Sequence, residues 1–216
     1  MTRRSLLLGL AGAAVVAVAG SWIATRQSGS QTGFATPAAA ADAEILPDIP
    51  MGSADAPITL IEYASYTCPH CATFHKEVFA PLKRDYIDTG KVKFIHREVY
   101  FDKFGLWAGT IAGCVGAPKY HAVSGMLYDT QKEWIGDAKE ATIADNLRKI
   151  GLKAGLSKEQ IDACMNDQAR LQSMVATFQK HATDDAIDAT PTLVIDGQKY
   201  SNMSYADLKK ILDAKL

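Results

Sequence analysis

Apolar and polar positions between residues 57 and 99 predict a strand, a helix and a second strand. The run Pro57–Ala64 is rich in β-branched and apolar residues, which is typical of a buried strand. From about residue 69 to residue 87 apolar side chains recur every three or four positions, as on one face of a helix. Thr89–Gly90 is expected to end this helix, and Val92–Val99 is the second strand. This order is that of a βαβ unit.

The pattern then changes to helical periodicity alone. Apolar residues at helical intervals predict helices near 104–115, 119–132, 138–153, 158–166 and 168–182. The strand signal returns at Pro191–Ile195, and Asp196–Gly197 is a typical two-residue hairpin turn leading into a last strand. An amphipathic helix over about 204–214 closes the chain.

The elements therefore follow the order β-α-β, a helical block, then β-β-α, which predicts an α/β fold. Neither flank is long enough to bury a core alone, so we expect the helical block to be inserted into one sheet domain. The predicted sheet domain comprises residues 45–102 and 187–216, and the predicted all-helical insertion comprises residues 103–186.

The first 26 residues differ from the rest. Arg3 and Arg4 precede an uncharged apolar run, Leu6–Ile23, which is the layout of an export signal. The paired arginines resemble a twin-arginine signal. The alternative is an uncleaved membrane anchor, because such a run is just long enough to span a bilayer. Residues 27–44 have the composition of a flexible tether. With either an export signal or an anchor, the rest of the chain is expected outside the cytoplasm, which in a bacterium is the periplasm.

Composition narrows the class of protein. The 23 Lys and Arg residues balance 24 Asp and Glu residues, so the chain carries no basic excess that would indicate a nucleic-acid partner. Four cysteines in 216 residues are too few for a disulfide-scaffold miniprotein. Each cysteine therefore needs its own explanation.

The strongest chemical signal is Cys68-Pro69-His70-Cys71, between the first predicted strand and its helix. At a helix start the first backbone N–H groups lack partners and favour a thiolate, so Cys68 is the predicted nucleophile. Pro69 suits the first helical turn because it lacks an N–H group. His70 adds a donor beside Cys68, and Cys71 is the predicted shielded, resolving thiol.

Other interpretations of the pair are a structural disulfide, a zinc site and two thiols placed there by chance. A plain structural disulfide is disfavoured because a bond across two residues is strained. A zinc site at Cys68, Cys71 and His75 lacks a second pair of ligands nearby, so we expect no metal. The strand before and the helix after the motif match the thioredoxin context, which favours redox activity. The other histidines, at positions 75, 96, 121 and 181, are expected to be surface or satisfied core residues.

The stretch Leu60–Cys71 resembles the active-site segment of the DsbA-like family of thiol–disulfide oxidoreductases. The helical insertion and the Thr190-Pro191 step are similar to that family too, and the likeness covers about residues 45–216. The resemblance implies a thioredoxin-like fold with the all-helical domain inserted between the β-α-β and β-β-α halves.

The resemblance also assigns roles to residues outside the motif. Glu62 is at the position of a buried acid that exchanges a proton with Cys71; the alternative is a strand residue with its carboxylate in solvent. Pro191 matches a cis-proline opposite the cysteine pair, and the backbone of Thr190 would pair with a bound substrate strand. Thr190 departs from the Val of well-known oxidants and is more similar to isomerase and reductase relatives.

Cys114 and Cys164 both fall in the helical block, and an even pair left over in an exported protein is expected to be oxidised. This arrangement is similar to that of some DsbA-like proteins, which have a second, structural disulfide in the insertion. Closing that loop would stabilise the fold by about 4 kcal/mol. Two buried free thiols, or a second redox centre, are the alternatives.

The expected function is a dithiol oxidase that introduces disulfides into reduced exported proteins. The redox-active disulfide needs no bound cofactor, and the resemblance implies a quinone-linked membrane partner that reoxidises it. We expect a monomer. One alternative is a disulfide isomerase or reductase that is kept reduced, as Thr190 suggests. A second alternative is a non-catalytic module on a thioredoxin fold that holds a metal or a partner.

Overall fold

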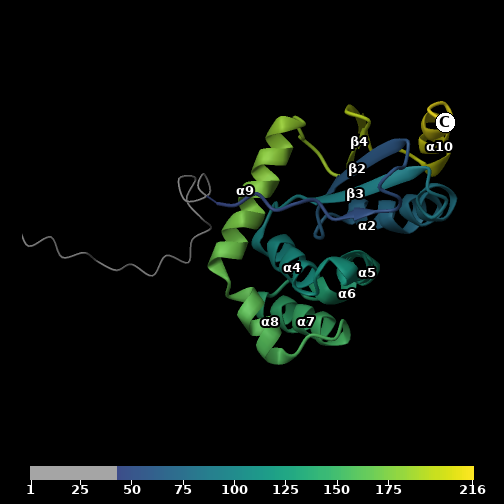
Figure 1. Cartoon of the computed structure of the whole chain (residues 1–216). Helices are drawn as coiled ribbons and strands as arrows, with labels where there is room; N and C mark the ends of the chain where they lie inside the picture. Colours follow the sequence, from purple (N-terminus) through teal and green to yellow (C-terminus); the bar gives the residue numbers. More distant parts are fainter. Residues whose placement is uncertain (1–42) are drawn as a thin grey trace, which may run out of the picture. The chain divides into compact units, whose positions relative to one another are not determined.

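A mixed β-sheet organises the α/β part of the chain in a computed structural model that describes residues 43–216 (Figure 1). Its strands are β1 (Pro50–Met51), β2 (Ile58–Ala64), β3 (Val92–Glu98), β4 (Thr192–Ile195) and β5 (Gln198–Ser201). Their order is β1-β3-β2-β4-β5. Strands β2 and β3 are parallel, and every other neighbouring pair is antiparallel.

One nearly continuous helical stretch joins β2 to β3. It consists of α2 (Pro69–Phe74), α3 (Ala80–Leu82) and two segments with π-helical hydrogen bonding, η1 (His75–Phe79) and η2 (Lys83–Ile87). The stretch buries an apolar face because Phe74, Val78 and Leu82 follow one another at four-residue intervals. It ends before Gly90, whose φ of +75° lies in the left-handed region that favours glycine.

The helical block follows β3. It contains α4 (Lys103–Cys114), α5 (Ala117–Asp129), α6 (Gln131–Ile135), α7 (Glu140–Lys153), α8 (Lys158–Met165) and α9 (Gln168–Asp184). Side chains at the helix starts satisfy the first backbone N–H groups. Asp102 accepts hydrogen bonds from the first turn of α4, and Ser157 and Gln160 form a capping box on α8.

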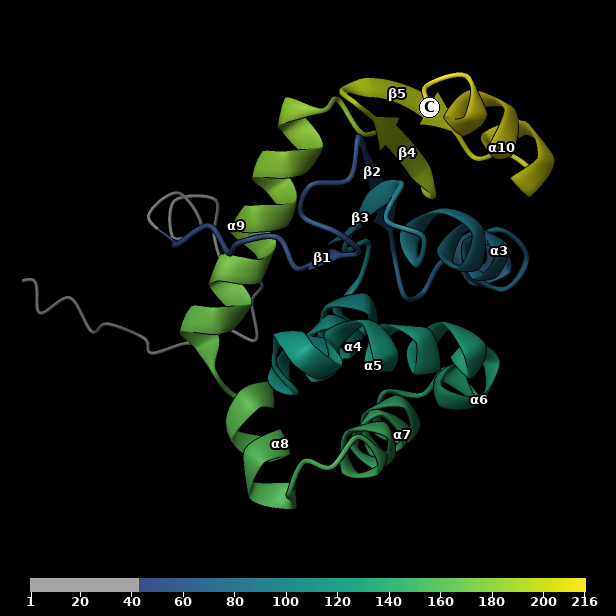
Figure 2. The same ribbon diagram turned by 45° about the vertical axis from the view of Figure 1, so that its right-hand side comes forward.

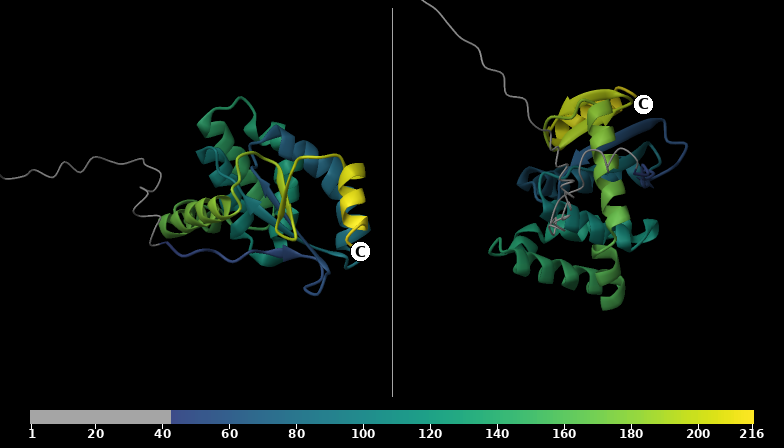
Figure 3. Two further views of the ribbon diagram at one scale, coloured as in Figure 1. Left: turned by 90° about the horizontal axis from the view of Figure 1, so that it is seen from above. Right: turned by 90° about the vertical axis from the view of Figure 1, so that its left-hand side faces the viewer.

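Helices cover both faces of the sheet. The helical stretch after β2 and helix α10 (Tyr205–Asp213) bury Leu60 and Phe94 on one face. Side chains alternate along a strand, so Tyr63 points to the other face and packs with Phe178 of α9. Helix α9 runs from the helical block back along the sheet (Figures 2 and 3). The block packs its own core around Ile111, Leu127 and Leu147.

This architecture confirms the predicted thioredoxin-like fold, with the helices placed between β-α-β and β-β-α segments. The predicted hairpin turn is also present, since Asp196 and Gly197 have φ values of +48° and +83°. The two-residue β1 was not predicted, because it is too short to show a periodic pattern. The described residues belong to one compact unit, and the limits of the two predicted domains stay a prediction.

The predicted leader and anchor (1–26) and nearly all of the predicted tether lie outside the described residues. Within residues 43–216, no helix has the length and apolar character needed to cross a bilayer.

Candidate functional site

Cys68 is the last residue before α2 begins at Pro69. Its carbonyl oxygen accepts hydrogen bonds from the N–H groups of Cys71 and Ala72, both at 3.2 Å. Its partly exposed thiol donates a hydrogen bond to the carbonyl oxygen of Thr190, 3.6 Å away. Cys68 and Cys71 are both free thiols, so the structure is that of the reduced pair. A thiolate at Cys68 would face the positive end of the helix.

Cys71 lies one turn further along α2 and is fully buried. Burial, and next the nearby Glu62 carboxyl group, raise the pKa of the Cys71 thiol well above its usual range. Cys71 is therefore a thiol in the reduced protein. The contrast between a partly exposed and a buried thiol is the one that a nucleophile and its resolving partner require.

Glu62 is buried in the middle of β2, with only 3% of its surface exposed. Its Oε1 atom has no hydrogen-bond partner within residues 43–216. Burial, and next the negative charge that Cys68 can carry, raise the pKa of Glu62 to about 8. Glu62 can thus hold a proton at neutral pH, and the alternative that placed its carboxylate in solvent is wrong.

The Thr190–Pro191 peptide bond is cis, as the resemblance implies, and it precedes β4. A groove of about 330 Å³ adjoins it, lined among others by His70, Thr190, Pro191 and Tyr200. His70 is exposed and contributes to this groove. The groove therefore lies next to Cys68, where an extended polypeptide could pair with the Thr190 backbone.

Two side chains near or within the helical block hold the loop before Cys68, and the sequence analysis missed both. Gln131, buried at the start of α6, donates hydrogen bonds from Nε2 to the carbonyl oxygens of Tyr66 (2.8 Å) and Cys68 (2.9 Å). Asp102 accepts a hydrogen bond of 2.8 Å from the hydroxyl of Thr67. Nothing in the local pattern distinguishes Gln131 from a surface glutamine, because its partners lie more than sixty positions away.

Cys114 and Cys164 form a disulfide between α4 and α8, with Cα atoms 6.3 Å apart. The expected second disulfide in the helical block is thus present, and the alternative of two free thiols is wrong. The bond joins the two ends of a loop with a sequence separation of 50. It links helices of the block, whereas Cys68 and Cys71 lie at the junction of β2 and α2.

Apart from the Cys114–Cys164 disulfide, the predicted site residues lie close to one another. Cys68, Cys71, Glu62, Thr190 and Pro191 gather around the start of α2, with Pro69 and His70 exposed beside them. Across residues 43–216 there is no group of three or more His, Cys, Asp or Glu side chains placed to hold a metal ion.

Comparison with known proteins places the chain in a family. A family model described as thioredoxin matches residues 45–214. A Rickettsia typhi protein whose name marks it as a proposed protein-disulfide oxidoreductase is 27% identical over 170 residues, which cover 78% of this chain and 62% of the relative. The chain thus spans about three fifths of the length of that relative. The disulfide bond formation protein D of Bacillus subtilis is 26% identical over 178 residues, with 77% and 76% of the two chains covered.

Several solved structures are also similar to this chain. Wolbachia pipientis α-DsbA1 is similar with a TM-score of 0.71 and 26% identity, covering 82% of this chain and 94% of that one. A protein-disulfide isomerase from Novosphingobium aromaticivorans shares the fold, with a TM-score of 0.70 and 23% identity. The fold, the cysteine pair at the start of α2 and these likenesses together show that the chain belongs to the thioredoxin family and, within it, to the DsbA-like thiol–disulfide oxidoreductases.

Proposed function

We propose that this protein is a dithiol oxidase that introduces disulfides into exported proteins. The observation that carries the proposal is the asymmetry of the cysteine pair. Cys68 is accessible at the helix start, beside the groove at Thr190, while Cys71 is buried beside a protonatable Glu62. Relatives named for protein-disulfide oxidoreduction and disulfide bond formation support the same chemistry.

The reaction begins from the oxidised pair. A substrate thiolate attacks the sulfur of Cys68, the Cys68–Cys71 bond breaks, and its electron pair leaves on Cys71. Glu62 gives its proton to Cys71, whose high pKa favours the thiol. A second thiolate of the substrate then attacks the substrate sulfur of the mixed disulfide and displaces Cys68. The substrate gains one disulfide, and the enzyme keeps two electrons as the reduced pair.

The direction of this exchange depends on how well the reduced pair is stabilised. A thiolate at Cys68 faces the first turn of α2, which stabilises the reduced form and makes Cys68 a good leaving group. An oxidase of this kind has a reduction potential about 150 mV above that of thioredoxin, equivalent to about 7 kcal/mol. Thr190 supports the second candidate, an isomerase or reductase that works in the reduced state.

The cellular location, the substrates and the oxidising partner of the protein are part of this proposal. Residues 1–26 would export it to the periplasm or anchor it to the inner membrane, where reduced, newly translocated proteins are its substrates. Turnover requires an oxidant for the reduced pair, and a quinone-linked membrane protein would supply it. The protein would act as a monomer.

The deciding experiment is a redox titration of the Cys68–Cys71 pair against glutathione, with oxidation of a reduced, unfolded protein substrate as the activity assay. We expect a potential near −120 mV and rapid oxidation, both abolished in Cys68→Ser. A Cys114→Ser/Cys164→Ser double variant is the matched control, because it removes two cysteines away from the reacting pair. A potential near −270 mV would refute the oxidase direction, and full activity of Cys68→Ser would refute the mechanism.

A further inference from the structure

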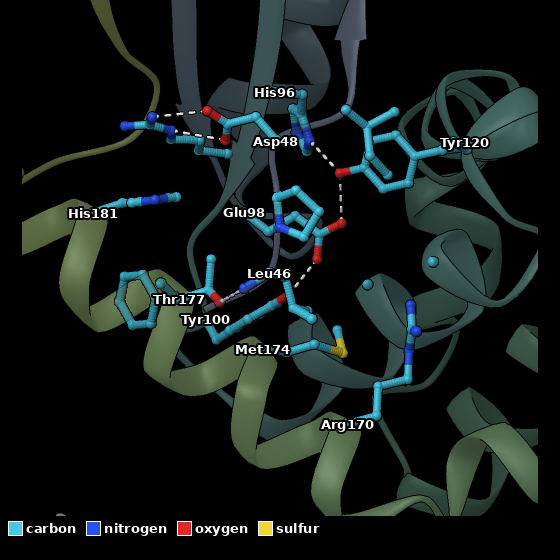
Figure 4. Close-up of a pocket in the computed structure, with 17 residues that line it drawn as sticks. Leu46, Asp48, His96, Glu98, Tyr100, Tyr120, Arg170, Met174, Thr177 and His181 are labelled. Carbon is cyan, nitrogen blue, oxygen red and sulfur yellow. Dashed lines mark hydrogen bonds and ion pairs between the residues drawn. The ribbon is translucent and has the colours of Figure 1, made fainter. Parts of the chain in front are cut away.

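A second cavity of about 330 Å³ lies away from the cysteine pair, in the part of the chain drawn in Figure 4. Its walls come from the segment before β1, from β3 and the residues after it, and from helices α4, α5 and α9. None of the cysteines lines it. A volume of this size is within the range of sites for small organic molecules.

A cation that forms no direct ion pair within residues 43–216 lines this cavity. The Nε atom of Arg170, at the start of α9, is buried and has no hydrogen-bond partner in the described part of the chain. No carboxylate of residues 43–216 lies within the 4.0 Å of an ion pair with Arg170. The guanidinium group lies over Gly113 of α4, where an added Cβ would come within 2.2 Å of Nη2. The Arg170 residue as a whole is only partly buried, but its Nε atom is shielded from water, and a buried donor without a partner is costly unless a ligand accepts from it.

The nearest acid of the cavity is already engaged by other groups. Glu98, at the end of β3, accepts hydrogen bonds from the hydroxyl groups of Tyr120 (2.7 Å) and Tyr66 (3.2 Å), and from that of Tyr100. Figure 4 labels Tyr100 and Tyr120 beside Glu98, whereas Tyr66 does not line the cavity. Burial raises the pKa of Glu98, and the positive charge of Arg170 opposes this at longer range. The Glu98 oxygens accept hydrogen bonds from the tyrosines and not from Arg170. The Nε donor of Arg170 is therefore left without an acceptor in the described chain, and a ligand anion would supply one.

The remaining wall of the cavity is largely apolar. Leu46, Met174 and Phe178 line it, and the backbone N–H of Leu46 donates to the hydroxyl of Thr177 at 2.8 Å, which holds that segment in place. A compact anion such as phosphate would pair with Arg170 but leave this apolar surface in contact with water. A carboxylate attached to an apolar body fits both, because guanidinium binds carboxylate with two parallel hydrogen bonds.

We propose that this cavity is a binding site for a small organic acid, with its carboxylate on Arg170 and its apolar body along Leu46, Met174 and Phe178. The proposal is independent of the thiol chemistry, since the groove at Thr190 has no lining residue in common with this cavity. Oxidation of protein substrates can therefore fail or succeed without deciding it.

The test is a titration of the full-length reduced protein with 3-phenylpropionate, followed by calorimetry and by amide chemical shifts. We expect saturable binding with a dissociation constant of about 1 mM, as ligand efficiency allows for a molecule of this size. The neutral analogue 3-phenylpropanamide should bind about tenfold more weakly, because it cannot form the charged pair. Shift changes should centre on Gly109 and Gly113 and leave the amides around His70 unchanged.

Two variants give matched controls. Arg170→Met removes the guanidinium group and should abolish binding of the acid, whereas Arg170→Lys keeps the charge and should weaken binding severalfold. Arg148→Met removes a partly exposed arginine of α7 that pairs with Asp162 and does not line the cavity, so it should bind like the natural chain. Equal binding of acid and amide, unchanged binding in Arg170→Met, or no saturation up to about 20 mM would each overturn the proposal.

Discussion

Gln131 offers the most direct test of how the helical block supports the active-site loop. In Gln131→Leu the side-chain volume is nearly kept, but the two hydrogen bonds to the carbonyl oxygens of Tyr66 and Cys68 are lost. The Cys68 oxygen keeps the N–H groups of Cys71 and Ala72. The Tyr66 residue is buried, and its carbonyl oxygen has no second partner in the described chain.

The two carbonyl groups therefore contribute unequally to the cost. A buried acceptor left without a partner costs about 1–3 kcal/mol, and the loss of one bond from an oxygen that retains others costs about 0.5–1.5 kcal/mol. Burying the leucine side chain offsets part of the sum. We expect Gln131→Leu to lower the free energy of unfolding by about 2 kcal/mol, measured by urea denaturation with an unchanged m-value.

Asn146→Leu is the matched control for Gln131→Leu. Its side-chain amide also donates to two backbone carbonyls of the helical block, those of Glu133 and Trp134, at 3.2 and 3.4 Å. Asn146 is only partly buried, so water can replace its bonds and the expected loss is below about 0.5 kcal/mol. If Gln131→Leu were no less stable than Asn146→Leu, Gln131 would not support the active-site loop.

Three further predictions concern other parts of the chain. The raised pKa of Glu62, about 8 in the folded protein, means that the reduced protein should lose stability as pH rises from about 4.5 to 8, by at most about 5 kcal/mol. Urea denaturation at several pH values should show this fall as a difference in unfolding free energy between the natural chain and Glu62→Gln, because other shifted groups such as buried His96 titrate in both. A difference that does not change with pH would contradict the assignment. Removing the Cys114–Cys164 bond in the double serine variant should lower the free energy of unfolding by about 4 kcal/mol and leave oxidation of substrates intact. A loss below about 1 kcal/mol would show that the loop is ordered without the bond. Asp102→Ala removes the cap of α4 and the partner of Thr67, and should cost about 1–2 kcal/mol in thermal or urea unfolding, whereas an unchanged stability would mean that water replaces the carboxylate.

Much of the fold follows from patterns within single segments. The strands, the helix after β2 and the Asp196–Gly197 turn depend on short-range periodicity and on the backbone preferences of individual residues. The two-residue β1 was not predicted, because only its pairing with β3 defines it as a strand. The order of the segments predicted an α/β fold with an inserted helical block, and the resemblance to the DsbA-like family implied the thioredoxin-like topology.

Patterns within single segments predicted the surroundings of the cysteine pair only in part. The sequence placed Cys68 and Cys71 at a helix start, because the motif and its flanking strand lie within a dozen residues. The hydrogen bond from Cys68 to Thr190 joins residues 122 positions apart, and the burial of Glu62 depends on the sheet and the helix that enclose it. Such contacts have no signature in local composition.

The sequence by itself therefore determined the reactive motif, the order of the elements and the existence of two cysteine pairs. Tertiary structure alone decided which groups surround them: the buried acid beside Cys71, the Gln131 amide behind the loop and the unpaired Arg170 in a separate cavity. The physical reason is that secondary structure and helix starts depend on neighbours a few residues away. Desolvation and hydrogen-bond pairing depend instead on which distant segments the fold brings together.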